Sequence, residues 1–181
     1  MVYIFLADGF EEVEAITPYD YLKRSGLEVK LIGIDKKEIC GSHNLKVLVD
    51  FEINEIEITP KKEDFIILPG GLKGTENLFS NKKLLNILKE ASKVSSIGAI
   101  CAAPSILGRL GILKNKKACC YPGFEKFLEG SQILQEDVVV DSNIITSKGA
   151  GTAQQFSFEI VKYLKGEKES EKIQKQVQWK Y

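Results

Sequence analysis

Cys101 is the side chain of this sequence best placed to act as a nucleophile. It lies between the apolar run Ser95–Ile100, which is typical of a buried strand, and a helix predicted over Ala102–Leu107. A thiol at a helix N-terminus faces unpaired backbone N–H groups and the positive end of the helix dipole, which favour the thiolate. The segment Gly98–Ala103 also matches part of the G-x-S-x-G turn that displays a nucleophile above a sheet. We therefore expect Cys101 to have the lowest pKa of the four thiols.

The other three cysteines, Cys40, Cys119 and Cys120, are interpreted as free thiols that pack as small hydrophobic residues, which is also the alternative role for Cys101. Two of them are adjacent, and the chain is long enough to be stable without disulfides. The chain has no C-x-x-C pattern and only one histidine, His43, so we predict no metal site.

Two further segments follow buried strands, where functional groups collect in parallel α/β sheets. Gly70 and Gly71 have no Cβ, so their N–H groups could form an oxyanion site, although an ordinary turn is the alternative. The glutamates Glu11, Glu12 and Glu14 could be a solvated cluster at a helix start. One of them placed near a thiolate would instead have a raised pKa and carry a proton at neutral pH.

Length and charge exclude several classes of protein. The 181 residues are predicted to form one domain, 1–181, and 25 Lys and Arg balance 25 Asp and Glu. With no concentrated positive charge we expect no nucleic-acid partner, and with no apolar run of about 20 residues we expect no membrane span. The opening residues lack a basic leader segment, so a cytoplasmic location is predicted.

The hydrophobic pattern predicts an α/β fold with a mainly parallel sheet. Residues 38–59 mostly alternate and predict short strands at the sheet edge, whereas residues 69–74 are too rich in glycine for a regular element. Residues 11–18 are either an irregular turn before a helix that begins near Pro18 or a helix kinked there. The remaining expected elements are buried strands 2–7, 27–34, 65–68 and 95–100, a hairpin of 138–140 with 144–146, and helices around 84–91, 102–107, 152–164 and after 166.

Four motifs together, in this order, resemble the ThiJ/PfpI superfamily and, within it, the branch of the Parkinsonism-associated protein deglycase (DJ-one). They are Asp8–Asp20, Leu68–Gly71, Ala99–Pro104 and Thr146–Thr152. The resemblance spans roughly residues 2–166. It implies a flavodoxin-like three-layer sandwich with helices on both faces of the sheet, in a homodimer.

By this resemblance, Cys101 matches the reactive cysteine, Glu14 its protonated partner, and Gly70 and Gly71 the backbone donors of the pocket. Ala102, next to the cysteine, is also expected to bind substrate.

The resemblance also covers positions outside the pair of Glu14 and Cys101. Asp20 and Arg24 fall on positions tied to pocket support and the dimer contact. Two residues depart from the pattern. Tyr121 replaces a histidine and is expected to bind the substrate without acting as an imidazole base, and His43 stands where an arginine is common.

The resemblance implies a cofactor-free enzyme acting on a small reactive carbonyl or a glycated protein, such as one that converts methylglyoxal to lactate. The alternative is a redox sensor or chaperone in which Cys101 is oxidised to a sulfinate that Glu14 holds by a hydrogen bond. A weaker alternative is a peptidase or amidotransferase-like hydrolase, which needs a histidine beside Cys101.

Overall fold

The computed structural model describes residues 1–180 and is built around a seven-stranded sheet with the order β10-β11-β7-β6-β1-β2-β5. The six pairs of neighbouring strands are parallel except β10 with β11, which are antiparallel. The mainly parallel sheet predicted from the sequence is therefore confirmed. The strands of this sheet are β1 (Val2–Leu6), β2 (Val29–Gly33), β5 (Phe51–Glu52), β6 (Phe65–Leu68), β7 (Ser96–Ile100), β10 (Val138–Asp141) and β11 (Ile144–Ser147).

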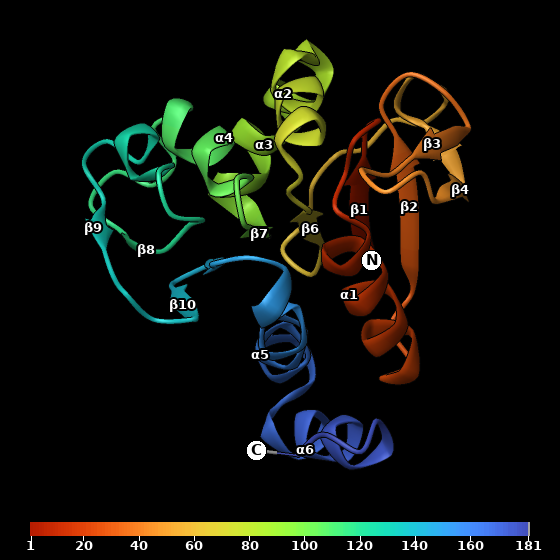
Figure 1. Ribbon diagram of the computed structural model, residues 1–181, viewed down its shortest axis with the longest axis vertical. Coiled ribbons are helices and arrows are strands. Elements are labelled where there is room, and N and C mark those ends of the chain that lie inside the picture. The colour runs from red at the N-terminus through yellow and green to blue at the C-terminus, as the bar shows by residue number, and fades with distance from the viewer. Residues whose placement is uncertain (181) are drawn as a thin grey trace.

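Helices cover both faces of the sheet, as Figure 1 shows. Because successive strand residues point to opposite faces, Phe5 packs in the core shared with α2, α3 and α4, whereas Leu6 packs in the core shared with α1, α5 and α6. This arrangement confirms the three-layer, flavodoxin-like sandwich. The helices are α1 (Glu12–Arg24), α2 (Leu72–Ser80), α3 (Lys82–Val94), α4 (Pro104–Arg109), α5 (Ala153–Lys165) and α6 (Glu167–Gln176).

Shorter elements connect the layers. The predicted edge region contains the hairpin β3 (Glu38–Cys40) and β4 (Lys46–Leu48), which stands apart from the main sheet. The sequence did not indicate the two-residue strands β8 (Lys117–Ala118) and β9 (Gln132–Ile133), which form a separate parallel pair. Within residues 1–180 there are also three single 3₁₀ turns: η1 (Ile53–Glu55), η2 (Glu125–Phe127) and η3 (Ala150–Thr152).

Helix α1 begins at Glu12 and continues through Pro18, so of the two alternatives for residues 11–18, the irregular turn before a helix that starts near Pro18 is wrong. Proline removes one N–H from the helix ladder, but Pro18 is buried, and the helix also packs Tyr21 and Leu22 into the core. That burial outweighs the missing hydrogen bond. The early start matters for function because it places Glu14 in the first turn of the helix.

Helix α2 contradicts the prediction that residues 69–74 form no regular element, because it begins at Leu72. A Cβ at Gly74 would lie 2.7 Å from the backbone nitrogen of Phe10 and 2.8 Å from the carbonyl oxygen of Gly9. Glycine here therefore allows a helix to touch the loop after β1, and it does not mark a break. This contact brings the start of α2 against the start of α1.

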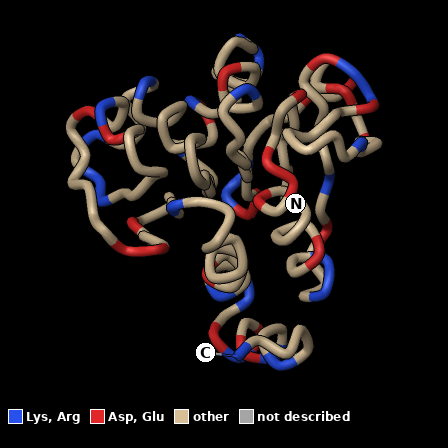
Figure 2. The backbone as a smooth tube through the Cα atoms, in the orientation of Figure 1, with Lys and Arg blue, Asp and Glu red and all other residues tan. Residues whose placement is uncertain are grey.

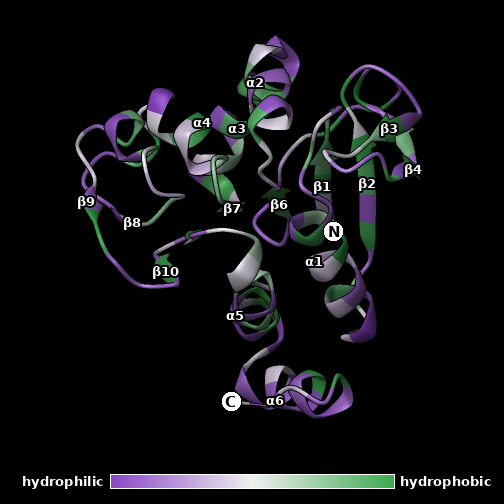
Figure 3. Ribbon diagram, in the orientation of Figure 1, coloured by the Kyte–Doolittle hydropathy of each residue, from purple (hydrophilic) through white to green (hydrophobic). Residues whose placement is uncertain are grey.

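Hydrophobic residues are concentrated in the inner strands, and charged residues are spread over the molecule. In Figure 2, the Lys and Arg segments and the Asp and Glu segments are both spread over the molecule. In Figure 3, the inner strands are mostly hydrophobic, whereas α6 is largely hydrophilic and buries only Ser170 and Ile173. Among the helices of residues 1–180, none has both the length and the apolar character that a bilayer span requires.

Candidate active site

Cys101 occupies the sharp turn between β7 and α4. Its φ of 65° is in the left-handed region, which is strained for a residue with a side chain. Two backbone hydrogen bonds hold this conformation: the N–H of Cys101 donates to the Ser147 carbonyl at 2.9 Å, and the Tyr121 N–H donates to the Cys101 carbonyl at 2.8 Å. The turn therefore presents the half-buried thiol at the carboxyl end of the sheet, as the sequence predicted.

Glu14 is a fully buried carboxyl group in contact with this thiol. Its Oε2 atom accepts a hydrogen bond of 2.8 Å from the Gly70 N–H, and the side chain is also hydrogen-bonded to Cys101. Its Oε1 atom is buried without a hydrogen-bond partner among the described residues. An unpaired buried carboxylate oxygen is costly, so this environment favours a carboxyl group that holds a proton.

Burial raises the pKa of Glu14 to about 7, against the hydrogen bonds from Gly70 and Cys101 that favour the ionised form. Burial and the charge of Glu14 together raise the pKa of Cys101 to about 12, although the N–H groups of Gly71 and Ala102 act in the opposite direction. The expected low thiol pKa is therefore wrong while Glu14 is ionised, because the helix N–H groups are outweighed by burial and by a neighbouring negative charge.

These two pKa values belong to the pair and not to either residue alone. One proton leaves the pair near pH 7 and the second leaves at a much higher pH. Around and above neutral pH the pair therefore carries one negative charge, which can lie on the carboxylate of Glu14 or on the sulfur of Cys101.

The backbone donors differ from the predicted set. The Gly70 N–H is already bonded to Glu14, so Gly70 positions the carboxyl group instead of serving as a free oxyanion donor. The donors that face the Cys101 sulfur are the N–H groups of Gly71 and Ala102. Gly71 needs its φ of 85°, and a Cβ there would lie 2.2 Å from the Gly9 carbonyl oxygen.

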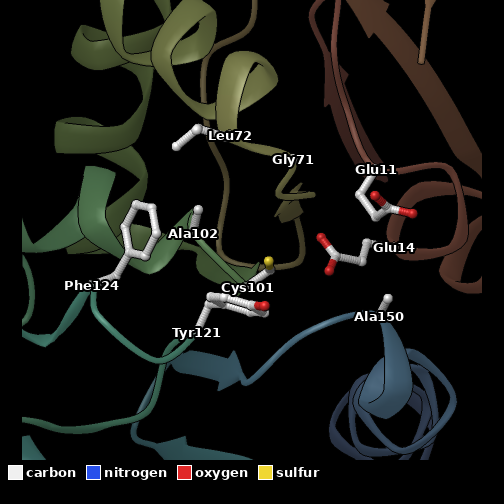
Figure 4. Close-up of a pocket in the computed structure, with 9 residues that line it drawn as sticks. All are labelled: Glu11, Glu14, Gly71, Leu72, Cys101, Ala102, Tyr121, Phe124 and Ala150. Atoms are coloured by element: carbon white, nitrogen blue, oxygen red, sulfur yellow. The ribbon is translucent and has the colours of Figure 1, made fainter. Parts of the chain in front are cut away.

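A cavity of about 460 Å³ opens above the thiol. Figure 4 shows the sulfur of Cys101 at its floor, with the Glu14 carboxyl group on one side and the Tyr121 ring below. Most of the wall is apolar. Leu72, Phe124 and Ala150 had no signal in the sequence that linked them to the site, because they approach from separate loops and elements. The lining residues are Glu11, Glu14, Gly71, Leu72, Cys101, Ala102, Tyr121, Phe124 and Ala150.

Tyr121 lies where the sequence placed it, beside the cysteine. Its side chain is 49% exposed, and its ring flanks Gly149, where a Cβ would lie 3.3 Å from the Cδ2 atom of Tyr121. A phenol can donate a hydrogen bond to a bound ligand, but it is not a base at neutral pH.

Asp20, Arg24 and His43 do not line the cavity. Arg24 pairs with Asp20 across one turn of α1, with 2.7 Å between Nε and Oδ2, and both side chains are about half exposed. His43 is 74% exposed, and its Nδ1 atom lies 2.8 Å from Oε2 of Glu12. No imidazole therefore borders Cys101 within residues 1–180.

The structure also assembles a polar cluster that the sequence did not indicate. Atoms of Glu11, Glu12 and His43 that could ligate a metal lie within 4.8 Å of one another. Burial alone would raise the pKa of Glu12, but hydrogen bonds from the His43 side chain and backbone lower it to about 2. The hydrogen bond to Glu12 raises the pKa of His43. Because Glu12 and His43 are 31 positions apart, they leave no local pattern, and only the fold reveals this cluster.

Comparisons with known proteins show the family to which the chain belongs. A model of the DJ-1/PfpI family matches residues 1–163. The chain is 37% identical over 164 residues to Protein DJ-1 homolog A of Arabidopsis thaliana, which covers 89% of this chain and 41% of that protein. It is 34% identical over 169 residues to Deglycase PfpI of Pyrococcus furiosus, which covers 91% of this chain and 100% of that protein.

The chain spans about two-fifths of the length of the Arabidopsis thaliana relatives that it matches. Among solved structures, that of oxidized Toxoplasma gondii DJ-1 has a TM-score of 0.93 and 30% identity to this chain. That match covers 99% of this chain and 98% of the Toxoplasma gondii chain.

Proposed function

Because the chain belongs to the DJ-1/PfpI family, we propose that it is a cysteine-dependent, cofactor-free enzyme of the glyoxalase or deglycase type. Its substrates are 2-oxoaldehydes such as methylglyoxal, or early glycation adducts on proteins. The observation that carries this proposal is the buried pair of Glu14 and Cys101, which holds one nucleophile and one mobile proton at the floor of a cavity. The name of Deglycase PfpI supports the same class of chemistry.

In the first step, the Cys101 thiolate adds to the aldehyde carbon of methylglyoxal, and the carbonyl π electrons move to the oxygen. The N–H groups of Gly71 and Ala102 lie beside the reacting sulfur and stabilise the oxyanion. The oxyanion then takes the proton from Glu14. Glu14 is left as a carboxylate next to the new hemithioacetal, which makes it available as a base.

In the second step, the Glu14 carboxylate removes the hydrogen from the carbon bonded to sulfur, which gives an enediolate. The hydroxyl proton then moves to the former ketone oxygen, and Glu14 returns its proton to the neighbouring carbon. The former aldehyde carbon is thereby oxidised to a thioester while the ketone carbon is reduced to an alcohol, so no external electron donor or acceptor is needed. Water hydrolyses the thioester, releases lactate and restores the Cys101 thiol. The Glu14 pKa of about 7 suits a group that must both give and accept a proton at neutral pH.

A redox sensor remains the second candidate because Cys101 has hydrogen-bonding groups on several sides. The carboxyl group of Glu14 and the N–H groups of Gly71 and Ala102 could all hold the oxygens of a sulfinate. The similar Toxoplasma gondii DJ-1 is oxidized in its solved structure. The peptidase alternative lacks an observation in its favour, since the chain's one histidine, His43, is hydrogen-bonded to Glu12 outside the cavity.

Lactate production from methylglyoxal tests the proposal. Wild type is expected to form lactate, and both Cys101→Ser and Glu14→Gln are expected to lose about 100-fold or more in kcat. Cys40→Ser is the matched control, because Cys40 is a half-buried thiol that does not line the cavity, and it should retain full activity. Equal lactate production by Cys101→Ser and wild type would contradict the proposal.

Reaction with peroxide on the same variants separates enzyme from sensor. In Glu14→Gln the thiol should still be oxidised, since glutamine removes the proton carrier but leaves a hydrogen-bond donor next to sulfur. A sensor without enzyme activity would show peroxide oxidation of Cys101 in wild type and no lactate from any variant.

The assembly and location of the protein stay predictions. We propose one domain, residues 1–181, in a cytoplasmic homodimer, with the Asp20–Arg24 pair near the contact between the two copies. Sedimentation of wild type and Arg24→Ala tests the dimer.

A further inference from the structure

Glu11 is a charged residue of the Cys101 cavity that the proposed reaction does not use. The cavity has two charged lining residues, Glu11 and Glu14, and no lysine or arginine among the described residues borders it. Figure 4 shows the Glu11 carboxylate on the same side of the cavity as Glu14 and across from the Phe124 ring. The cavity therefore has a negative side and an apolar side.

The backbone of Glu11 is anchored at this rim, and its carboxylate shares a donor with Glu12. The Glu11 N–H donates to the Gly70 carbonyl at 3.0 Å, and the Ser42 hydroxyl lies 3.0 Å from both Oε2 of Glu11 and Oε2 of Glu12. The side chain keeps 20% of its surface exposed. Glu11 is thus a held, partly accessible carboxylate facing the space where a substrate must enter.

The neighbouring cationic side chains, His43 and Lys73, do not cancel the negative charge of Glu11. His43 lies 2.8 Å from Glu12 but 3.7 Å from Glu11, so Glu12 is its main partner. Glu11, Glu12 and His43 together carry a charge of −1 even when the histidine is protonated, by simple addition of −1, −1 and +1. Lys73 borders two neighbouring cavities with Asp8 instead of the Cys101 cavity. The negative charge of Glu11 also reaches the floor of the site, where it helps to raise the pKa of Glu14.

We propose that Glu11 makes the Cys101 cavity selective for substrates that carry a positive charge next to the reactive carbonyl, and that it disfavours anionic ones. A guanidinium or ammonium group near the aldehyde would meet the Glu11 carboxylate, with the apolar wall of Tyr121 and Phe124 beside the carbon chain. This inference deepens the proposed function and rests on it only for the identity of the reaction. The charge selectivity itself is a property of the cavity.

Charged thiol reagents test the selectivity without any turnover. Methanethiosulfonates carrying a trimethylammonium or a sulfonate group transfer their alkylthio group to a thiolate, forming a mixed disulfide and releasing methanesulfinate. The rates at Cys101 are followed by peptide mass spectrometry, and the ratio of cation to anion rates is compared with that of free 2-mercaptoethanol. Because both reagents need the same thiolate, a change in the pKa of Cys101 cancels in this ratio.

We expect the ratio in wild type to exceed that of the free thiol by about tenfold, and Glu11→Gln to lower it several-fold. Glu171→Gln, the same charge change at an exposed position of α6 away from the cavity, should leave it unchanged. Leu72→Lys replaces a 64% exposed residue of the cavity rim with a positively charged one and should lower the ratio of cation to anion rates below that of wild type. An unchanged ratio in Glu11→Gln would overturn the inference, and a fall in Leu72→Lys shows that the assay responds to charge at the cavity rim.

Turnover assays distinguish this inference from the proposed function and locate the cation. Phenylglyoxals with a para-trimethylammonium or a para-carboxylate group serve as small substrates, and the methylglyoxal adduct of an arginine peptide serves as the protein-like one. Preference for either cationic substrate over the para-carboxylate supports the inference. Preference for the trimethylammonium phenylglyoxal points to a cation on a small molecule, and preference for the arginine peptide adduct points to a cation on a protein side chain. Turnover with no preference overturns it. If no glyoxal reacts while the thiol-reagent ratio still responds to Glu11→Gln, the proposed function fails and the charge selectivity stands.

Discussion

Glu14 and Cys101 approach each other from two different elements and close around Gly70. A Cβ on Gly70 would lie 2.6 Å from the Cβ of Cys101 and 2.7 Å from Oε2 of Glu14, so only glycine fits between them. The carboxyl group comes from the first turn of α1, and the thiol comes from the turn after β7. This enclosure makes Glu14 and Cys101 share a proton in a buried space, and it links the stability of the protein to the protonation of Glu14.

The free energy of unfolding should fall as the pH rises through the titration of Glu14. The carboxyl group has a pKa of about 7 in the folded protein against 4.5 ordinarily, so between these values the folded state binds more protons than the unfolded chain. By linkage, stability present below pH 4.5 is lost as the pH passes 7, up to about 3 kcal/mol. Glu14→Gln lacks this titration, so it should gain stability relative to wild type as the pH rises from about 4.5 to about 8 in urea unfolding.

Glu171→Gln is the control for that series, because this exposed residue on α6 changes the net charge by the same amount. Its stability should follow wild type in parallel at every pH. A constant difference between Glu14→Gln and wild type across the pH range would show that Glu14 has an ordinary pKa in the folded state.

Gly70→Ala should disable the site while leaving the fold in place. The added methyl group must push apart Glu14 and Cys101, and displacement of reacting groups by about 1 Å costs on the order of 100-fold in rate. We expect kcat/KM for methylglyoxal to fall by about that factor, with an unchanged far-UV circular dichroism spectrum. Gly151→Ala, where a Cβ meets nothing within 4 Å, is the matched control and should keep wild-type activity. Full activity of Gly70→Ala would mean that the pair does not need its observed spacing.

The sequence predicted the layered fold because its signals are local and strong. Uninterrupted apolar runs such as Phe65–Leu68 have few alternatives to a strand buried on both faces, and the intervening helices then require parallel crossovers. The position of Cys101 followed from the same signals, since it lies between a strand and a helix. Its left-handed backbone conformation and its contact with Glu14 were beyond reach, because the first is held by hydrogen bonds with Ser147 and Tyr121 and the second joins residues far apart in the sequence.

Hydrogen-bond partners and raised pKa values are set by the tertiary structure. The sequence indicated that the Gly70 N–H could be an oxyanion donor, but not that it would donate to Glu14. Likewise, the helix dipole argues for an acidic Cys101, and only burial next to a carboxylate reverses that expectation. The glycine-rich start of α2 misled the prediction for a related reason: Gly74 is required by a neighbouring loop and not by its own helix.

Gly74→Ala tests that explanation directly. In an exposed helix interior this substitution stabilises a protein by about 1 kcal/mol, because alanine has the better helix propensity. Here the added Cβ would lie 2.7 Å from the Phe10 nitrogen, and backbone cannot move aside as a flexible side chain can. We expect a loss of about 1–3 kcal/mol in the free energy of unfolding, measured with urea. A stabilised variant would show that α2 and the loop after β1 can separate at no cost.

Tyr121→His should convert the pair at the floor of the cavity into one with a lower thiol pKa. Tyr121 lines the cavity, and its backbone N–H is bonded to the Cys101 carbonyl, so an imidazole at this position would lie near the sulfur. A protonated imidazole favours the thiolate and offsets the charge of Glu14, which is one of the causes that raise the pKa of Cys101 to about 12. The rate of Cys101 alkylation by iodoacetamide at pH 6 should therefore rise about tenfold over wild type. Tyr121→Phe removes the phenol hydroxyl without adding a base, so its alkylation rate should match wild type within about threefold. An unchanged alkylation rate in Tyr121→His would mean that position 121 does not act on the sulfur.

Neither wild type nor Tyr121→Phe should cleave an unstructured peptide, because no imidazole borders Cys101 within residues 1–180. Cleavage of the peptide by wild type that is lost in Cys101→Ser would restore the peptidase alternative.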